Sequence, residues 1–201
     1  MEDLNNKYIG TSSNKLNKSS LIVAMMCETI NNNQDIKRLL YYQSLNPLSP
    51  LGKYYDGNKK PQPNIDFSLL EETSNSKQLI FDEIFNPLMT IEESNCVYIS
   101  DIGGRLDDSV GNIGIEINVV VPYLRNKMMS LGEKRTHLIA SKIADLFDMI
   151  TVDKKLFPDY VSDLGNVQFE LTDYSYGRVA QKSTMVCFNM QFEVSILTLR
   201  S

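Results

Sequence analysis

The sequence contains no tryptophan, one histidine and three cysteines among its 201 residues. Cys27, Cys96 and Cys187 lie far apart, and neither their spacing nor their odd number indicates a zinc site or a disulfide framework. We therefore expect reduced, partly buried thiols. A single histidine leaves few nucleophile–base pairs of the kind that enzymes use. The composition thus argues against most enzymes, and we expect no catalytic residue, no metal and no cofactor.

Long apolar runs and an excess of positive charge are also lacking. No run approaches the roughly 20 apolar residues of a membrane helix, and the polar start of the chain predicts no secretory signal. The formal net charge of −5 argues against a protein whose main role is to wrap nucleic acid. With 42% hydrophobic and 22% charged residues, the chain is typical of a soluble globular protein without a membrane partner. The length suits one domain, or one core domain with long arms.

The first 94 residues divide into three stretches of different character. Residues 1–18 are rich in Asn, Lys and Ser, which predicts a flexible N-terminal arm. Residues 19–44 carry two stretches of helical periodicity, so we predict a helical hairpin whose second helix is capped by Asn32 and ends before Pro47. Residues 45–94 are rich in Pro, Gly and Asn but keep large side chains. They predict an extended arm or insertion, and residues 45–78 within it predict an arm that orders against a partner, in preference to a free linker.

The remaining residues, 95–201, alternate between strand and helix patterns. The strand pattern has period two with β-branched residues on one face, and it predicts one buried and one wet face of a sheet. The predicted strands are 96–102, 113–121, 167–172 and 186–196, and the predicted helix lies between 130 and 150. The fold class is therefore α+β, with an N-terminal helical hairpin and a β-β-α-β-β core of mainly antiparallel sheet and one packed helix. An irregular turn is predicted after 172, at Gly177.

Two features have the chemistry of a site. The stretch Asp101–Asp108 places three carboxylates around a Gly-rich turn, and hard cations bind such oxygens, but the spacing is not that of an EF-hand. A solvated hairpin loop is therefore the favoured interpretation. His137 falls in the first turns of the predicted helix, where a surface or partly packed histidine is favoured over a catalytic base. The alternative is a small metal- or ligand-binding, enzyme-like domain that uses the Asp101–Asp108 loop with His137.

Aromatic and basic side chains form the candidate interface. Tyrosine is enriched at protein interfaces, and a small basic cluster precedes the predicted helix. The cluster suits pairing with acidic side chains of this chain or its neighbours, or a DNA backbone. The candidate interface residues are Tyr41, Tyr42, Tyr54, Tyr55, Phe67, Arg125, Lys127, Lys134 and Arg135.

The order of elements over about residues 95–199 resembles the tail-terminator and tail-completion proteins of tailed bacteriophages. The stretches that carry this resemblance are 114–122, 135–147 and 188–194. Residues 36–48 resemble the start of neck and connector proteins from large low-GC phages such as the crAss-like gut phages. The insertion at 45–94 departs from the compact members of the family.

The resemblance implies a structural virion protein that performs no catalysis. It would form a ring in the phage neck or tail and serve head–tail joining or tail completion. The implied partners are a homo-oligomeric ring of six or twelve copies, neighbouring portal, neck or tail proteins, and channel DNA contacted without sequence specificity. The implied location is the virion, after assembly in the host cytoplasm. A cellular adaptor that recruits one partner through residues 45–78 is a further alternative.

Overall fold

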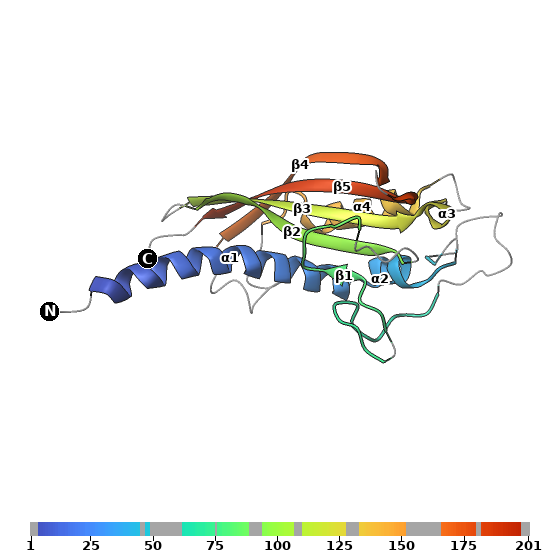
Figure 1. The fold of residues 1–201 in the computed structure, drawn as a ribbon, viewed down its shortest axis with the longest axis horizontal. Helices are drawn as coiled ribbons and strands as arrows, with labels where there is room; N and C mark the ends of the chain where they lie inside the picture. The colour runs from blue at the N-terminus through green and yellow to red at the C-terminus, as the bar shows by residue number, and fades with distance from the viewer. Residues whose placement is uncertain are drawn as a thin grey trace.

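A five-stranded sheet forms one layer of the molecule, with helices on one side of it (Figure 1). The computed structural model describes residues 4–44, 47–48, 62–74, 76–88, 94–106, 110–127, 133–151, 166–179 and 182–197. Its helices are α1 (Leu4–Asn32), α2 (Gln34–Tyr41), α3 (Tyr123–Asn126) and α4 (Arg135–Phe147), and its strands are β1 (Ile80–Phe81), β2 (Cys96–Leu106), β3 (Val110–Pro122), β4 (Asn166–Val179) and β5 (Lys182–Leu197). The strand order is β1-β2-β3-β5-β4, antiparallel except where β1 lies parallel to β2. The predicted α+β class is confirmed.

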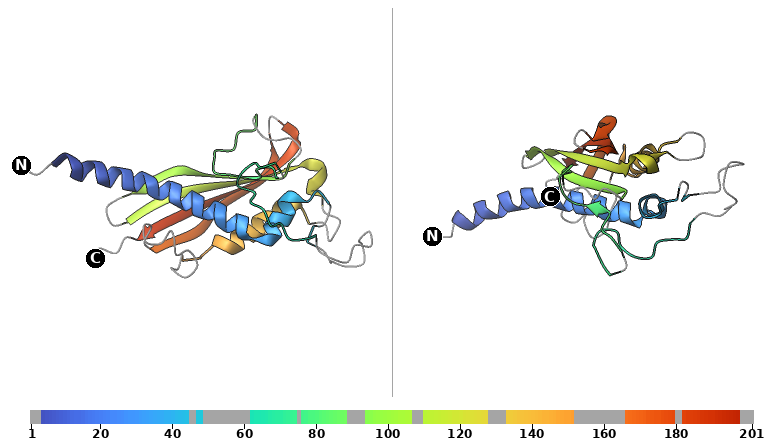
Figure 2. Two further views of the ribbon diagram at one scale, coloured as in Figure 1. Left: turned by 90° about the horizontal axis from the view of Figure 1, so that it is seen from below. Right: turned by 45° about the vertical axis from the view of Figure 1, so that its right-hand side comes forward.

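Helices α1, α2 and α4 cover one face of the sheet (Figure 2, left). Strand β3 turns Ile113, Ile115 and Ile117 towards them, and all three are buried, as the period-two pattern predicted. From α4, Ile139 and Ile143 point into the same layer and are fully buried. Each such side chain stabilises the fold by about 1.5–3 kcal/mol relative to exposure, so this layer is the main core.

The opposite face of the sheet is polar along β3 and β5. The amide of Asn189 donates to Glu116 Oε1 at 2.8 Å and to Asn118 Oδ1 at 3.0 Å. The amide of Asn118 donates in turn to Glu116 Oε2 at 3.0 Å. These bonds run across the two central strands, so the polar face is held in one arrangement.

The N-terminal helices differ from the prediction. Helix α1 begins at Leu4, so residues 4–18 are helical, whereas their composition predicted an arm without a helix. Adding a turn to an existing helix is easier than starting a new one, and the packed second half of α1 provides that start. The cap of α2 is Asn33 rather than Asn32, because the Asn33 side chain accepts from the amides of Asp35 and Ile36.

Helix α2 continues past the end of α1 after a bend at Asn33 and does not fold back along it, so the two helices form no antiparallel hairpin (Figures 1 and 2). The division of the chain at residues 18, 44 and 94 stays a prediction.

The described residues 62–74 and 76–81 of the predicted insertion pack against helices of this chain. The Gln34 side chain makes two hydrogen bonds to the backbone of Ile65. Its Oε1 accepts from the Ile65 N–H at 2.9 Å, and its Nε2 donates to the Ile65 carbonyl at 3.1 Å. Asn31 Oδ1 accepts from the Leu69 amide at 2.8 Å. The side chains of Ile65 and Leu69 are buried. Since polar side chains of α1 and α2 satisfy this extended backbone, the prediction that it orders against a partner is wrong for these residues.

Strands β2 and β4 continue through sequences typical of turns, at which the predicted strands ended. Strand β2 passes Gly103-Gly104 and reaches Leu106 with a register shift between Asp101 and Gly104. Gly103 has φ +94°, and a Cβ on Gly104 would lie 2.2 Å from the carbonyl oxygen of Asn112, so both positions require glycine. Strand β4 likewise continues through Gly177 to Val179, where an irregular turn was predicted.

Arg135, predicted as an interface residue, is instead completely buried at the start of α4. Its Nη1 donates to the carbonyls of Leu39 at 2.8 Å and Tyr42 at 2.6 Å, and its Nη2 donates to the Ser44 carbonyl. The amide of Asn95 donates to Leu39 O as well, at 3.1 Å. The last carbonyls of a helix lack partners within the helix and carry its negative end. Arg135 and Asn95 therefore complete the end of α2 and join it to α4 and β2.

Replacing Arg135 by Leu should lower the free energy of unfolding by about 3 kcal/mol, because three carbonyls lose a charged donor. Urea denaturation measures this as a lower midpoint. The matched control is Lys142→Leu, which removes the partly exposed ion pair with Asp35 at 2.7 Å and should change stability by less than about 1 kcal/mol. An Arg135→Leu chain with the wild-type midpoint would contradict the capping role.

Candidate interaction surface

Aromatic and basic side chains gather where α3, the start of α4 and the end of β4 meet. All of them are solvent-exposed, with 84% of Leu124, 67% of Tyr174 and 50% of Tyr123 accessible. We call this the basic-aromatic surface, and it consists of Tyr123, Leu124, Lys127, Lys134, His137, Tyr174, Tyr176 and Arg178. Large exposed side chains that cluster in this way mark interaction sites rather than ordinary surface.

The rings of this surface hold one another in place. His137 meets Tyr176 at 4.7 Å and Phe188 at 5.0 Å, both edge to face, and Tyr174 stacks on Phe188 at 5.8 Å. The ammonium of Lys134 lies 4.2 Å from the centre of the Tyr176 ring. Such contacts reduce the freedom of these side chains, so the surface is ordered in the unbound chain.

Asn126, the last residue of α3, connects the three elements that carry the surface. It is buried, and its Oδ1 accepts from the Thr136 amide at 2.9 Å in the first turn of α4. Its Nδ2 donates to the Tyr176 hydroxyl of β4 at 3.1 Å. Strand β3 ends at Pro122, and the single turn of α3 then brings the chain to Asn126. One buried amide side chain therefore sets the positions of Lys134 and His137 relative to Tyr176.

The surface carries three cations, and the exposed carboxylate of Glu133 lines the same hollow as Lys127 and Lys134. Lys127, Lys134 and Arg178 contribute cations, and Arg178 lies 5.0 Å from the centre of the Tyr123 ring. Partial burial lowers the pKa of His137 below its ordinary value, and Lys134 lowers it further. His137 is therefore neutral at pH 7, and the charge comes from the lysines and the arginine. A hollow of about 430 Å³ between α3 and α4 offers a shallow recess within this surface.

The structure brings only part of the predicted interface together. Lys127 and Lys134 lie on the basic-aromatic surface, whereas Arg125 lines a separate cleft of about 640 Å³ with Tyr41 and Tyr42. The ring of Tyr41 lies 5.2 Å from the ring of Tyr42 and 5.1 Å from the ring of Phe67, so it packs within this chain at the edge of the hydrophobic core. Tyr54 and Tyr55 lie outside the described residues.

Five members of the surface were not predicted from the sequence. They are Tyr123, Leu124, Tyr174, Tyr176 and Arg178. Tyr174, Tyr176 and Arg178 stand two residues apart, as residues on one face of a strand do. This spacing was the feature of the sequence that could have predicted them.

Of the alternative site at Asp101–Asp108 with His137, the structure places Asp101 and His137 apart. Asp101 accepts a hydrogen bond from the Ser19 hydroxyl and lies opposite Ile115 in the sheet. His137 contacts Phe188, which lies opposite Val119, and β3 and β5 separate Asp101 from β4. Asp107 and Asp108 lie outside the described residues. Among the residues that the structure describes, no group of three His, Cys, Asp or Glu side chains is arranged to hold a metal ion.

Comparisons with known proteins add one structural likeness. No protein-family model matches the sequence, and no curated protein matches it. Among solved structures, the chain is similar to a chain in the virion of a native gene transfer agent particle, with a TM-score of 0.34 and 11% identity. The likeness covers 59% of this chain and 78% of that chain, and at this TM-score it assigns neither fold nor function. Within the described ranges, no helix has the length and apolar character to span a membrane.

The three cysteines are buried or half-buried in the described structure. Burial raises the pKa of Cys27, Cys96 and Cys187 to about 12 each. The thiol of Cys187 also donates to Asn118 Oδ1 at 3.3 Å. Because the thiolate is the nucleophile, none of the three has the environment of a reactive cysteine.

We expect the folded chain to resist a thiol reagent such as 5,5′-dithiobis(2-nitrobenzoate) at pH 8, and all 3 cysteines to react in urea. The raised pKa values also predict that stability falls as pH rises from about 9, where unfolded thiols ionise, towards 12, where folded ones do. Absorbance of the released thiolate measures labelling. Stoichiometric labelling of the native chain within minutes would contradict the inert environment.

Proposed function

We propose that this chain is a structural protein of a bacteriophage virion that assembles through its basic-aromatic surface. The observation that carries the proposal is an exposed, pre-ordered set of tyrosines, Leu124 and cations on one end of the fold. Tyrosine and arginine dominate the residues that contribute most to protein–protein affinity. A surface of this composition supports a contact with another protein subunit rather than a small-molecule site.

Helix α1 supports the same proposal. Its 29 residues span about 44 Å, and its N-terminal part extends past the edge of the sheet (Figure 1). Helices in proteins draw most of their stability from packing against other elements. The projecting turns of α1 therefore suit a contact with a neighbouring subunit.

The order β2, β3, α4, β4, β5 is the order of elements on which the resemblance to tail-terminator proteins rests. The finer proposal follows from that resemblance: a ring of six or twelve copies in the neck or tail, without catalysis, beside portal, neck or tail proteins. Non-specific contact with channel DNA and a place in the virion after assembly in the host cytoplasm belong to the same proposal. A closed ring requires that two different surfaces of each copy meet.

The test is the native mass of the purified chain over a range of concentrations, with negative-stain images of the same samples. We expect the wild type to form closed rings. Leu124→Ser should shift assembly to at least tenfold higher concentration, because its 84% exposed side chain would be buried in the contact.

The matched control is Ile84→Ser, which removes another aliphatic side chain that is 73% exposed but lies outside the basic-aromatic surface. This variant should assemble as the wild type does. A wild-type chain that stays monomeric at every concentration, with no rings in the images, would contradict the proposed function.

A further inference from the structure

The polar face of the sheet carries carboxylates from β3, β4 and β5, and Arg105 of β2 lies at the end of this face, opposite Asn112. Glu170 of β4 lies directly opposite Glu193 of β5. Two residues before Glu193, Gln191 of β5 pairs with Asp173 of β4 on one side and with Glu116 of β3 on the other. We call Glu116, Glu170, Asp173 and Glu193 the acidic face. The ion pairs found among the described residues join Asp35 to Arg38 and Lys142, and none includes Glu170 or Glu193. Like charges directly opposite one another across strands are destabilising, so this face favours an external cation.

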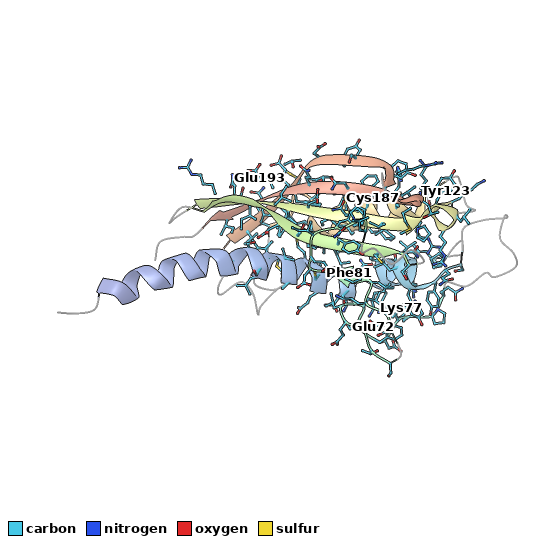
Figure 3. All side chains as sticks on the ribbon, in the orientation of Figure 1. Glu72, Lys77, Phe81, Tyr123, Cys187 and Glu193 are labelled. Carbon is cyan, nitrogen blue, oxygen red and sulfur yellow. The ribbon has the colours of Figure 1, made fainter. Side chains whose placement is uncertain are left out.

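The acidic face and the basic-aromatic surface point in different directions. Arg178 lies opposite Val186 of β5, seven residues from Glu193, which corresponds to about 23 Å along the strand. The two residues are also on opposite faces of the sheet by their register. Figure 3 shows Tyr123 at one end of the molecule and Glu193 towards the other. The two sets of charges therefore do not neutralise one another within one copy.

The acidic face also offers an apolar contact. The side chain of Ile102 lies over Gly114, where a Cβ would come within 2.8 Å of it, and 53% of Ile102 is exposed. Gly114 is the partner of Glu193 in the sheet, so Ile102 stands beside the carboxylates. Tyrosine rings with flanking cations complement an aliphatic side chain with flanking carboxylates.

We propose that the basic-aromatic surface of one copy docks on the acidic face of a second copy of this chain. The inference rests on the proposed function and names the two surfaces that meet in it. The contact is head-to-tail, so each copy uses both surfaces once, and a suitable rotation between copies closes the assembly into a ring. The cations of Lys127, Lys134 and Arg178 then face Glu170 and Glu193 of the next copy.

Charge reversal tests this pairing through complementation. The first variant, Lys127→Glu with Lys134→Glu, makes both surfaces acidic, and the second, Glu170→Lys with Glu193→Lys, makes both basic. All four side chains are exposed, and unchanged urea midpoints will show that both variants fold. We expect each variant by itself to need more than tenfold higher concentration to assemble. An equimolar mixture should assemble at close to the wild-type concentration with the two variants in equal amounts.

Single reversals elsewhere provide the matched controls. Lys77→Glu and Glu72→Lys change the same charges at exposed positions on the far side of the helices from the sheet, as Figure 3 shows, and should leave assembly unchanged. Assembly of the wild type should weaken as salt rises, because exposed charges are screened.

Three results would overturn the inference. Wild-type assembly with both reversed variants assembling normally would reject the docking and keep the proposed function. Two defective variants that fail to assemble when mixed would show that each surface binds something else, DNA among the candidates for the basic one. A wild-type chain that is monomeric throughout would reject both the docking and the proposed function.

Discussion

The buried guanidinium of Arg135 is the contact on which the arrangement of helices and sheet depends. Burial of a cation is unfavourable, and here it lowers the pKa of Arg135 to about 10, with Arg125 adding to the effect. The charge persists at neutral pH because the carbonyls at the end of α2 surround it. Arg135 and Asn95 share the Leu39 carbonyl, and among the described residues Arg135 alone reaches from α4 to the carbonyls of Tyr42 and Ser44, so it holds α4 against the end of α2.

The packing of α4 against α2 also determines the geometry of the basic-aromatic surface. Thr136 follows Arg135 directly, and its amide fixes the buried Asn126, which in turn fixes Tyr176. His137 comes next and packs on the same tyrosine ring. Contacts between neighbouring residues therefore connect the core to the basic-aromatic surface. Loss of the Arg135 side chain should weaken the packing of the core and the order of that surface.

The sequence predicted the elements of the fold that depend on regular alternation of side chains along a strand. It did not predict contacts between residues that lie far apart in the chain. The alternation around Ile115 and Phe192 predicted β3 and β5 because side chains of a strand divide between two faces. It could not show that Gln34 binds the backbone of Ile65, 31 residues away. Arg135 was placed on the surface because arginine is seldom fully buried without partners, and its partners are backbone carbonyls that no side-chain pattern reveals. Tyr176 was missed because its neighbour Gly177 indicated a turn.

Charge segregation is the step that connects this fold to assembly. Copies that each carry a net charge of −5 repel one another at long range, so a uniform distribution of charge would keep them apart. Lys127, Lys134 and Arg178 lie at one end, and the acidic face collects carboxylates away from them. Approach in the head-to-tail orientation alone brings opposite charges together, whereas acidic faces that meet each other add repulsion. In the proposed docking, the same distribution that excludes the wrong contact also selects the direction in which copies join.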